Sequence, residues 1–164
     1  MVYPRFRCFV FFFLLIFLRI SSAHALELEG RVVRVRDGDT IVMLDAGREL
    51  HVIRLAHIDT PEKNQPYGNR AKQFVSSLVY GKTVRIDVTD RDRYGRLIGV
   101  VYIGATNVNL QLVRHGYAWW YREYSRDVSY GRTELDAFER RSGLWADSRP
   151  VPPWEWRRKK REAS

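Results

Sequence analysis

The sequence Arg-Leu-Ala-His-Ile-Asp-Thr-Pro-Glu, residues 54–62, joins an apolar segment that contains an arginine to a turn rich in carboxylates. Arg54 and Asp59 are five residues apart, so on one regular strand their side chains would point to opposite faces. Because Pro61 cannot continue a paired strand, we expect Asp59 to lie beyond the strand that carries Arg54. Two carboxylates and a carbonyl-rich turn suit a hard cation, and arginine suits a phosphate. We therefore expect the rest of the chain to bring a second arginine and a third carboxylate to this place.

Strand patterns flank this segment on both sides. Turn signals at Asp37-Gly38 and Ala46-Gly47 connect the first three of them, which predicts an antiparallel meander. The expected strands cover residues 30–36, 40–45, 49–58, 82–88 and 96–103.

Three segments have the pattern of helices. In the clearest, residues 69–81, the apolar side chains share one face and Gly81 ends the helix. Shorter helices are expected over residues 108–116 and 133–141. Together these elements predict an α+β fold with a mainly β core, a five-stranded OB-fold Greek-key barrel with about three covering helices. Such partly open barrels commonly bind nucleic acids, although a fold alone says little about chemistry.

The chain divides into three parts. Residues 1–25 combine a basic start, an apolar run over residues 9–18 and an Ala-x-Ala pattern at residues 23–25, which is typical of a secretory signal peptide. The run is shorter than the roughly 20 residues that span a membrane, but Arg19 keeps an uncleaved anchor as the alternative. Residues 26–148 are the expected globular domain, and residues 149–164 a tail rich in proline, tryptophan and basic residues. We expect a periplasmic or secreted monomer without stable membrane association after cleavage.

The basic character of the chain is concentrated at its ends. Of the net charge of +9, residues 1–25 contribute three arginines and residues 149–164 a net +4, which leaves the globular part with about +2. A basic surface favours polyanions such as nucleic acid or anionic lipid, but a solubilising tail gives a similar number. We expect residues 157–161 to form a mobile tail with weak affinity for phosphate, and Trp154 and Trp156 to pack back on the domain.

Further carboxylates and arginines come from two turns. Asp37 and Asp39 would point to one face of an extended chain, although Asp-Gly is also favoured in hairpins for backbone reasons alone. The segment Asp92-Arg-Tyr-Gly-Arg96 is either a solvated hairpin or a mount that lets Arg96 hold a phosphate bidentately. For Arg54 the alternative is a structural ion pair, and for Glu62 it is capping of a loop or helix.

Histidine and cysteine do not point to a metal or thiol site. The four histidines lack zinc-site spacing, and Cys8, the single cysteine, lies within the expected signal peptide, so no disulfide is expected. The aromatic residues between positions 117 and 130 either pack in the core or stack on nucleobases.

Three motifs in order resemble the staphylococcal nuclease-like, or thermonuclease, family. They are Asp37-Gly-Asp-Thr40, the segment from Arg54 to Glu62, and Asp92-Arg-Tyr-Gly-Arg96, and the resemblance covers about residues 30–148. It implies an OB-type barrel and a Ca²⁺-dependent nuclease that hydrolyses DNA and RNA by metal-assisted attack of water and leaves 3′-phosphate ends.

The resemblance also implies roles for single residues. Asp39 and Asp59 would hold Ca²⁺ through their carboxylates and Thr60 through its backbone carbonyl, with Asp37 in the outer shell. Glu62 would act as general base, and Arg54 and Arg96 would clamp the phosphate. The implied substrate contacts are Tyr94, Tyr121, Tyr124 and Lys63. A catalytically silent barrel that binds nucleic acid is the alternative; silent copies typically lose one of these groups, whereas here all are present.

Overall fold

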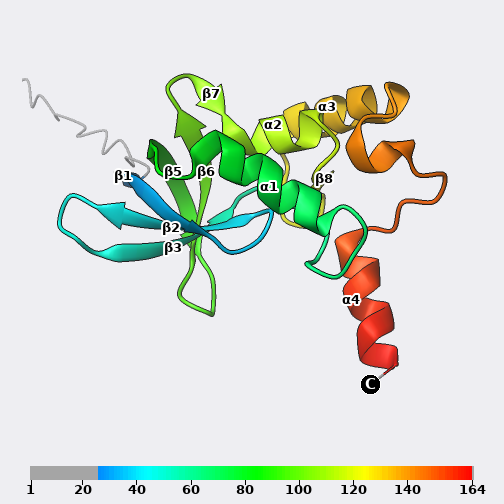
Figure 1. Ribbon diagram of the computed structural model, residues 1–164, viewed down its shortest axis with the longest axis horizontal. Coiled ribbons are helices and arrows are strands. Elements are labelled where there is room, and N and C mark those ends of the chain that lie inside the picture. Colours follow the sequence, from blue (N-terminus) through cyan, green and yellow to red (C-terminus); the bar gives the residue numbers. More distant parts are fainter. Residues whose placement is uncertain (1–25, 164) are drawn as a thin grey trace, which may run out of the picture.

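The computed structural model describes residues 26–163, which are organised around a curved sheet that closes on itself (Figure 1). Strand β1 pairs antiparallel with both β2 and β5, β5 pairs with β6, and a parallel pairing of β3 with β6 closes the barrel. The predicted α+β fold with an OB-type barrel is confirmed. The barrel strands are β1 (Leu26–Val35), β2 (Thr40–Asp45), β3 (Leu50–Leu55), β5 (Thr83–Arg91) and β6 (Leu97–Ile103), and β7 (Thr106–Asn107) extends β6.

The turn between β1 and β2 needs its glycine because it is crowded. A Cβ added to Gly38 would lie 2.7 Å from Oγ1 of Thr60 and 2.9 Å from Cβ of Ala71. Gly38 is not among the residues with positive φ, so the turn does not use the left-handed conformation that its Asp-Gly sequence favours. The predicted hairpin is present, and its glycine is required by the close approach of the segment around Thr60.

The strand expected over residues 49–58 is broken. Strand β3 ends at Leu55, and His57 has a left-handed backbone with φ of 68°. The chain then enters β4 (Ile58–Asp59), which pairs with β8 (Trp119–Trp120) in a separate small sheet. Asp59 therefore lies beyond the regular pairing of β3, as the spacing from Arg54 required.

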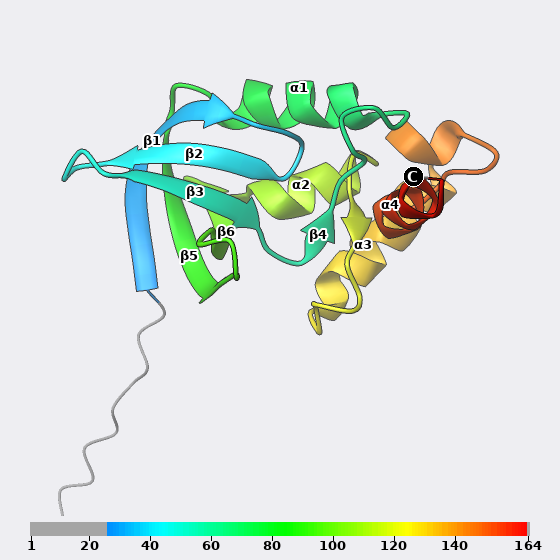
Figure 2. The same ribbon diagram turned by 90° about the horizontal axis from the view of Figure 1, so that it is seen from below.

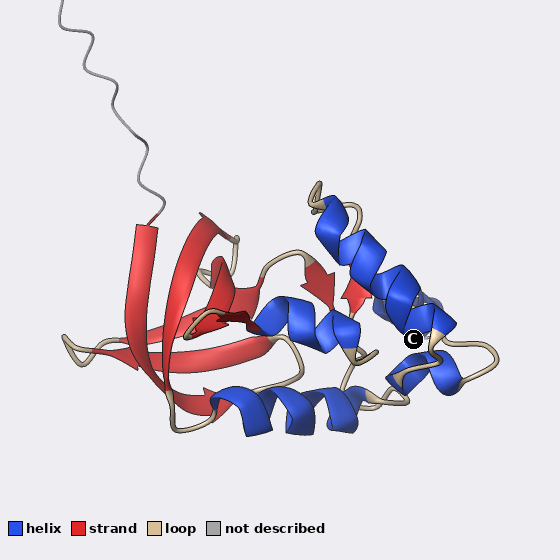
Figure 3. Ribbon diagram, turned by 90° about the horizontal axis from the view of Figure 1, so that it is seen from above, coloured by secondary structure: helices blue, strands red, loops and turns tan. Residues whose placement is uncertain are grey.

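Helices cover the barrel and gather at one of its ends (Figures 2 and 3). Helix α1 (Gly68–Val79) contacts β1 and α2 (Val108–Arg114), and α2 contacts α3 (Val128–Glu139). Helix α3 begins five residues before the predicted start at residue 133, because the side chain of Asp127 caps it. A 3₁₀ turn, η1 (Gly143–Ala146), follows α3.

A fourth helix, α4 (Pro153–Glu162), replaces the irregular tail that the sequence predicted. Pro153 occupies the first helical position, where a backbone N–H has no partner within the helix, so proline is tolerated there. Basic residues fill the last turn, where their positive charge interacts favourably with the helix dipole. Figures 1 and 2 place α4 at the end of the barrel away from the β2–β3 hairpin. Helix α4 is thus added to the roughly three covering helices that the sequence predicted.

The core fills the barrel and the space beneath α1 and α2. Its main cluster includes Ile41, Met43, Ile53, Val75 and Leu112, all fully or almost fully buried. Within residues 26–163, no helix is long and apolar enough to cross a membrane. The predicted signal peptide at residues 1–25 lies outside the described residues.

The cap of α3 gives a stability prediction. Asp127 accepts a hydrogen bond from the backbone N–H of Ser129 at 2.9 Å, and hydrogen bonds from Ser129 lower the pKa of the Asp127 carboxyl. Asp127→Ala should reduce the free energy of unfolding by about 1 kcal/mol at neutral pH, whereas Asp127→Asn, which keeps an acceptor oxygen, should stay close to the wild type.

The pH dependence of this difference has a definite sign. A carboxyl whose pKa is lowered in the fold stabilises it above the unfolded pKa of 3.8, and this contribution is lost as the pH falls through the lowered value. The difference between wild type and Asp127→Ala should therefore shrink below pH 3.8 in urea denaturation series. An equal loss in the Asn variant would show that the cap does not carry the effect.

Candidate active site

Three segments meet where β3 breaks. Asp39 directly precedes β2, and Arg54 lies opposite Thr40 in the β2–β3 pairing. Oδ2 of Asp39 accepts hydrogen bonds from the backbone N–H of Thr60 at 3.0 Å and from its hydroxyl at 2.9 Å. The turn before β2 is thereby fastened to the segment that follows β4.

Arg54 joins the two sides of the break. Its guanidinium lies 3.2 Å from Oδ2 of Asp39 and 3.0 Å from Oδ1 of Asp59. It also donates to the backbone carbonyls of Leu55 at 2.9 Å and Ile58 at 3.0 Å. The side chain is only 14% exposed, so Arg54 makes the structural ion pair that the sequence left open as an alternative.

Burial and charge act in opposite directions on the two buried carboxyls. Burial raises the pKa of Asp39, but Arg54 and the hydrogen bonds from Thr60 outweigh it, and the pKa is lowered. The pKa of Asp59 is raised, mainly by burial, because the charge of Asp39 adds to it and the arginines only partly compensate. Two buried carboxylates, both paired with arginines, supply oxygen ligands of the kind that a hard divalent cation prefers.

Asp37 adds a third carboxylate to this region. Its Oδ1 accepts a hydrogen bond from the backbone N–H of Asp39 at 3.1 Å. Burial and the neighbouring charge of Asp39 raise the pKa of Asp37 to about 6. The two aspartates that the sequence placed on one face are therefore close enough to influence each other.

Glu62 lies on the loop between β4 and α1, and its side chain is 41% exposed. Its backbone N–H donates to Oε1 of Gln65 at 3.1 Å, and its backbone carbonyl is so close to Gly68 that a Cβ there would come within 1.9 Å of the oxygen.

Gln65 is buried and also donates to the carbonyl of Val151 at 2.6 Å. No local sequence pattern predicts this role for Gln65, because its partner lies 86 residues away. Lys63 is exposed on the same loop.

Arg157 of α4 reaches this site, which the sequence did not predict. Its Nη2 lies 2.7 Å from Oδ2 of Asp59, and its Nη1 lies 2.8 Å from Oε1 of Glu62 and 3.3 Å from Oδ1 of Asp59. The three-residue spacing between Trp154 and Arg157 is a helical pattern that offered a weak signal.

Arg96 is held just before a neighbouring strand, β6. Its Nε pairs with Oδ2 of Asp92 at 2.7 Å, and its guanidinium lies 5.8 Å from the ring centre of Tyr94. Arg96 directly precedes β6, whose first residue is opposite Ile53 of β3, next to Arg54. The side chain of Arg96 is 31% exposed, so it is more accessible than Arg54.

Aromatic side chains border the site on the other side. The ring of Tyr121 stacks on Trp154 with a centroid distance of 5.6 Å and packs on Tyr124 at 4.7 Å. Tyr124 and Tyr94 are both largely exposed. A cavity of about 300 Å³ opens here, lined by Trp119, Trp120, Tyr121, Arg122, Glu123, Glu134 and Trp154.

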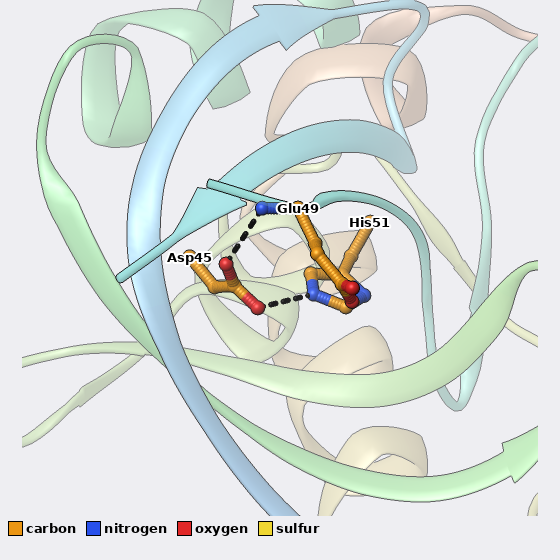
Figure 4. A group of neighbouring side chains, drawn as sticks. All are labelled: Asp45, Glu49 and His51. Carbon is orange, nitrogen blue, oxygen red and sulfur yellow. Dashed lines mark hydrogen bonds and ion pairs between the residues drawn. The ribbon is translucent and has the colours of Figure 1, made fainter. Parts of the chain in front are cut away.

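A separate acidic group lies on the β2–β3 hairpin (Figure 4). Within residues 26–163, Asp45, Glu49 and His51 are the only three residues of metal-ligand type whose ligand atoms all lie within 4.8 Å of one another. Asp45 accepts from the backbone N–H of Glu49 at 2.8 Å and pairs with Nε2 of His51 at 2.8 Å, as Figure 4 shows. These contacts join the two strands of the β2–β3 hairpin at its turn, so a structural role explains them.

The chain is similar to known nucleases. A family model described as staphylococcal nuclease homologue matches residues 52–147. A Haemophilus influenzae protein named as an uncharacterized endonuclease is 42% identical over 148 residues, which cover 90% of this chain and 83% of that protein. A protein of Escherichia coli O157:H7 with the same name is 47% identical over 135 residues, 82% of this chain and 88% of its own. A micrococcal nuclease of Shigella flexneri is 39% identical over 149 residues, 84% and 85% of the two chains.

The buried position of Arg54 gives a second stability prediction. Lysine keeps the charge of Arg54 but cannot bridge two carboxylates and two carbonyls at once, because it lacks the planar fork. Arg54→Lys should lower the free energy of unfolding by about 1–3 kcal/mol, the range for leaving a buried polar group without its hydrogen-bond partner. The matched control is Arg34→Lys on the exposed face of β1, which should change it by less than about 0.5 kcal/mol. Equal effects in urea denaturation would contradict the bridging role.

Proposed function

The chain belongs to the staphylococcal nuclease family, and on this premise we propose that it is a Ca²⁺-dependent nuclease that hydrolyses DNA and RNA. The observation that carries the proposal is the meeting of Asp39, Arg54, Asp59 and Glu62 from separate segments at one break in the barrel. The nuclease names of its relatives support the reaction class.

The oxygen ligands at the break fit a hard cation. We assign Asp39, Asp59 and the backbone carbonyl of Thr60 to hold Ca²⁺, with Asp37 in the outer shell. Both aspartates are almost completely buried, and oxygen ligands of this kind are the ones Ca²⁺ prefers. When bound, the cation supplies positive charge that stabilises the negative charge building on the attacked phosphate.

The side chains of the chain supply the remaining chemistry. Glu62 is partly exposed, so its carboxylate is able to meet a water molecule and take its proton as that water attacks phosphorus. Arg54 and Arg96 are assigned to the phosphate oxygens, where a guanidinium fork stabilises charge in the transition state. The expected products carry 3′-phosphate ends, in line with the family resemblance.

The exposed aromatic rings beside the site suit a flexible nucleic acid strand. Tyr94 and Tyr124 are each 70% exposed, and Tyr121 stands next to the aromatic cavity. Stacking on such rings is tolerant of base sequence, so these residues together with Lys63 are assigned to substrate binding. This arrangement fits a nuclease with both DNA and RNA among its substrates.

We also propose that residues 1–25 direct export to the periplasm or the medium and that the mature protein is a monomer without stable membrane association. N-terminal sequencing of the protein recovered from its final compartment should give a chain that begins at Leu26. A chain that still begins at Met1 and sediments with membranes would instead support the anchor.

A catalytically silent nucleic-acid-binding module is the second candidate. It is favoured by one observation, the engagement of Asp59 and Glu62 by Arg157. Against it stands the presence of every group that the proposed reaction uses. Binding of DNA without release of fragments would establish the silent module.

A plasmid nicking assay tests the proposed reaction. We expect cleavage with Ca²⁺ and little with a chelator. Glu62→Gln should lose about 10²–10⁴-fold in rate, the usual contribution of a general base. Arg54→Lys should also lose most activity, because the fork is lost.

The matched control for the base is Glu139→Gln, on the exposed side of α3, which should cleave like the wild type. Chelator-insensitive cleavage would contradict the cation assignment. Full activity of Glu62→Gln would contradict its role as base.

A further inference from the structure

Helix α4 is fixed beside the active site by contacts from two directions. The ring of Trp154 stacks on Tyr121 with an interplanar angle of 2° and packs edge-on against Trp119 at 5.8 Å. The segment leading into α4 is held by the hydrogen bond from Gln65 to the carbonyl of Val151. Because the backbone N–H of Glu62 donates to the side chain of the same Gln65, the position of α4 is connected to the loop that carries Glu62.

These contacts aim Arg157 at two functional carboxylates. One fork of its guanidinium spans Asp59 and Glu62, and both oxygens of Asp59 lie within 3.3 Å of its nitrogens. Arg54 occupies the other side of the same carboxylate. The proposed cation ligand and the proposed base are therefore engaged by the protein's own positive charge.

We propose that α4 is an autoinhibitory strap in which Arg157 competes with the divalent cation for Asp59 and holds the carboxylate of Glu62 in an ion pair. The proposal rests on the proposed function of this site. A divalent cation at Asp59 would stand next to the guanidinium of Arg157, and like charges at contact distance repel strongly where burial limits screening. Cation binding and the Arg157 contacts thus exclude each other.

The arrangement of the carboxylates agrees with such competition. The carboxylates of Asp39, Asp59 and Glu62 do not form a group of ligand atoms within 4.8 Å, whereas the hairpin group does. The guanidinium of Arg157 bridges Asp59 and Glu62: Nη2 donates to Asp59, and Nη1 donates to Glu62 and, at 3.3 Å, to Asp59. Its departure would leave their negative charges facing each other, and a cation would then draw them together.

Arg157 is placed so that it can leave. Its side chain is 34% exposed, against 14% for Arg54. The last turn of α4 carries Lys159, Lys160 and Arg161, which are exposed and basic. The phosphates of an arriving nucleic acid would attract this turn and favour the open state together with the cation.

The test measures cation affinity in the full chain without nucleic acid. The Ca²⁺ dissociation constant is determined by competition with Tb³⁺, whose luminescence is excited through tryptophan, for wild type, Arg157→Gln and the control Arg158→Gln. Arg158 lies next to Arg157 on α4 and is mostly exposed, with Glu162 4.0 Å away as its ion-pair partner. We expect Arg157→Gln to bind Ca²⁺ at least tenfold more tightly and Arg158→Gln to stay within twofold of the wild type.

A nicking titration provides a second measurement. The Ca²⁺ concentration for half-maximal cleavage should fall in Arg157→Gln in parallel with the dissociation constant. Thermal melting followed by circular dichroism checks that the variants are folded. If Arg157→Gln does not fold, Arg157→Lys, whose single ammonium cannot bridge both carboxylates, should still bind Ca²⁺ several-fold more tightly than the wild type.

The outcomes separate this proposal from the proposed function. Unchanged or weaker Ca²⁺ affinity in the Arg157 variants overturns the strap, because Arg157 would then merely organise the carboxylates. A wild type that cleaves DNA while its Arg157 variants bind Ca²⁺ like the wild type refutes only the strap. Tighter Ca²⁺ binding in the variants without any cleavage supports the competition between Arg157 and the cation and refutes the nuclease.

Discussion

The guanidinium of Arg54 is the interaction on which the arrangement of this site depends. Two carboxylates, Asp39 and Asp59, are almost completely withdrawn from water, which is unfavourable unless they are paired and hydrogen-bonded. Arg54 touches both and also caps two backbone carbonyls left by the break in its strand. The same side chain therefore neutralises buried charge and satisfies the backbone where regular pairing stops.

The break between β3 and β4 lies at His57, and it determines where the carboxylate of Asp59 is placed. The left-handed conformation of His57 is unfavourable for a residue with a Cβ, and the surrounding pairs of β3 with β6 and β4 with β8 hold it in place. Without the break, the five-residue spacing would send Asp59 to the opposite face from Arg54. The strained backbone of His57 thus places Asp59 on the same side as Arg54. The loop that contains Glu62 follows directly after this segment.

Local patterns predicted the barrel because β5 and α1 have clear periodicity and turn signals separate the first three strands. The spacing of Arg54 and Asp59 predicted where β3 must end. The pairing of β4 with β8 was beyond reach, since two-residue strands carry no periodic signal. The sequence predicted a mobile tail over residues 157–161, whereas Pro153 is well suited to the first position of α4. The contacts of Arg157 and Gln65 join residues more than 80 positions apart, and no local pattern encodes such pairs.

Arg54 and Arg157 both pair with Asp59, but their different burial gives them different roles. Arg54 is mounted on a paired strand, makes four contacts and is nearly buried, so losing it would cost the fold directly. Arg157 offers the same chemical group from a partly exposed position on α4, a helix whose other contacts include ring stacking by Trp154. A cation that arrives at Asp59 must displace one positive charge, and the less deeply held one yields. The positive charge at the end of the chain thus has a specific place at the active site, in addition to any general attraction for phosphate.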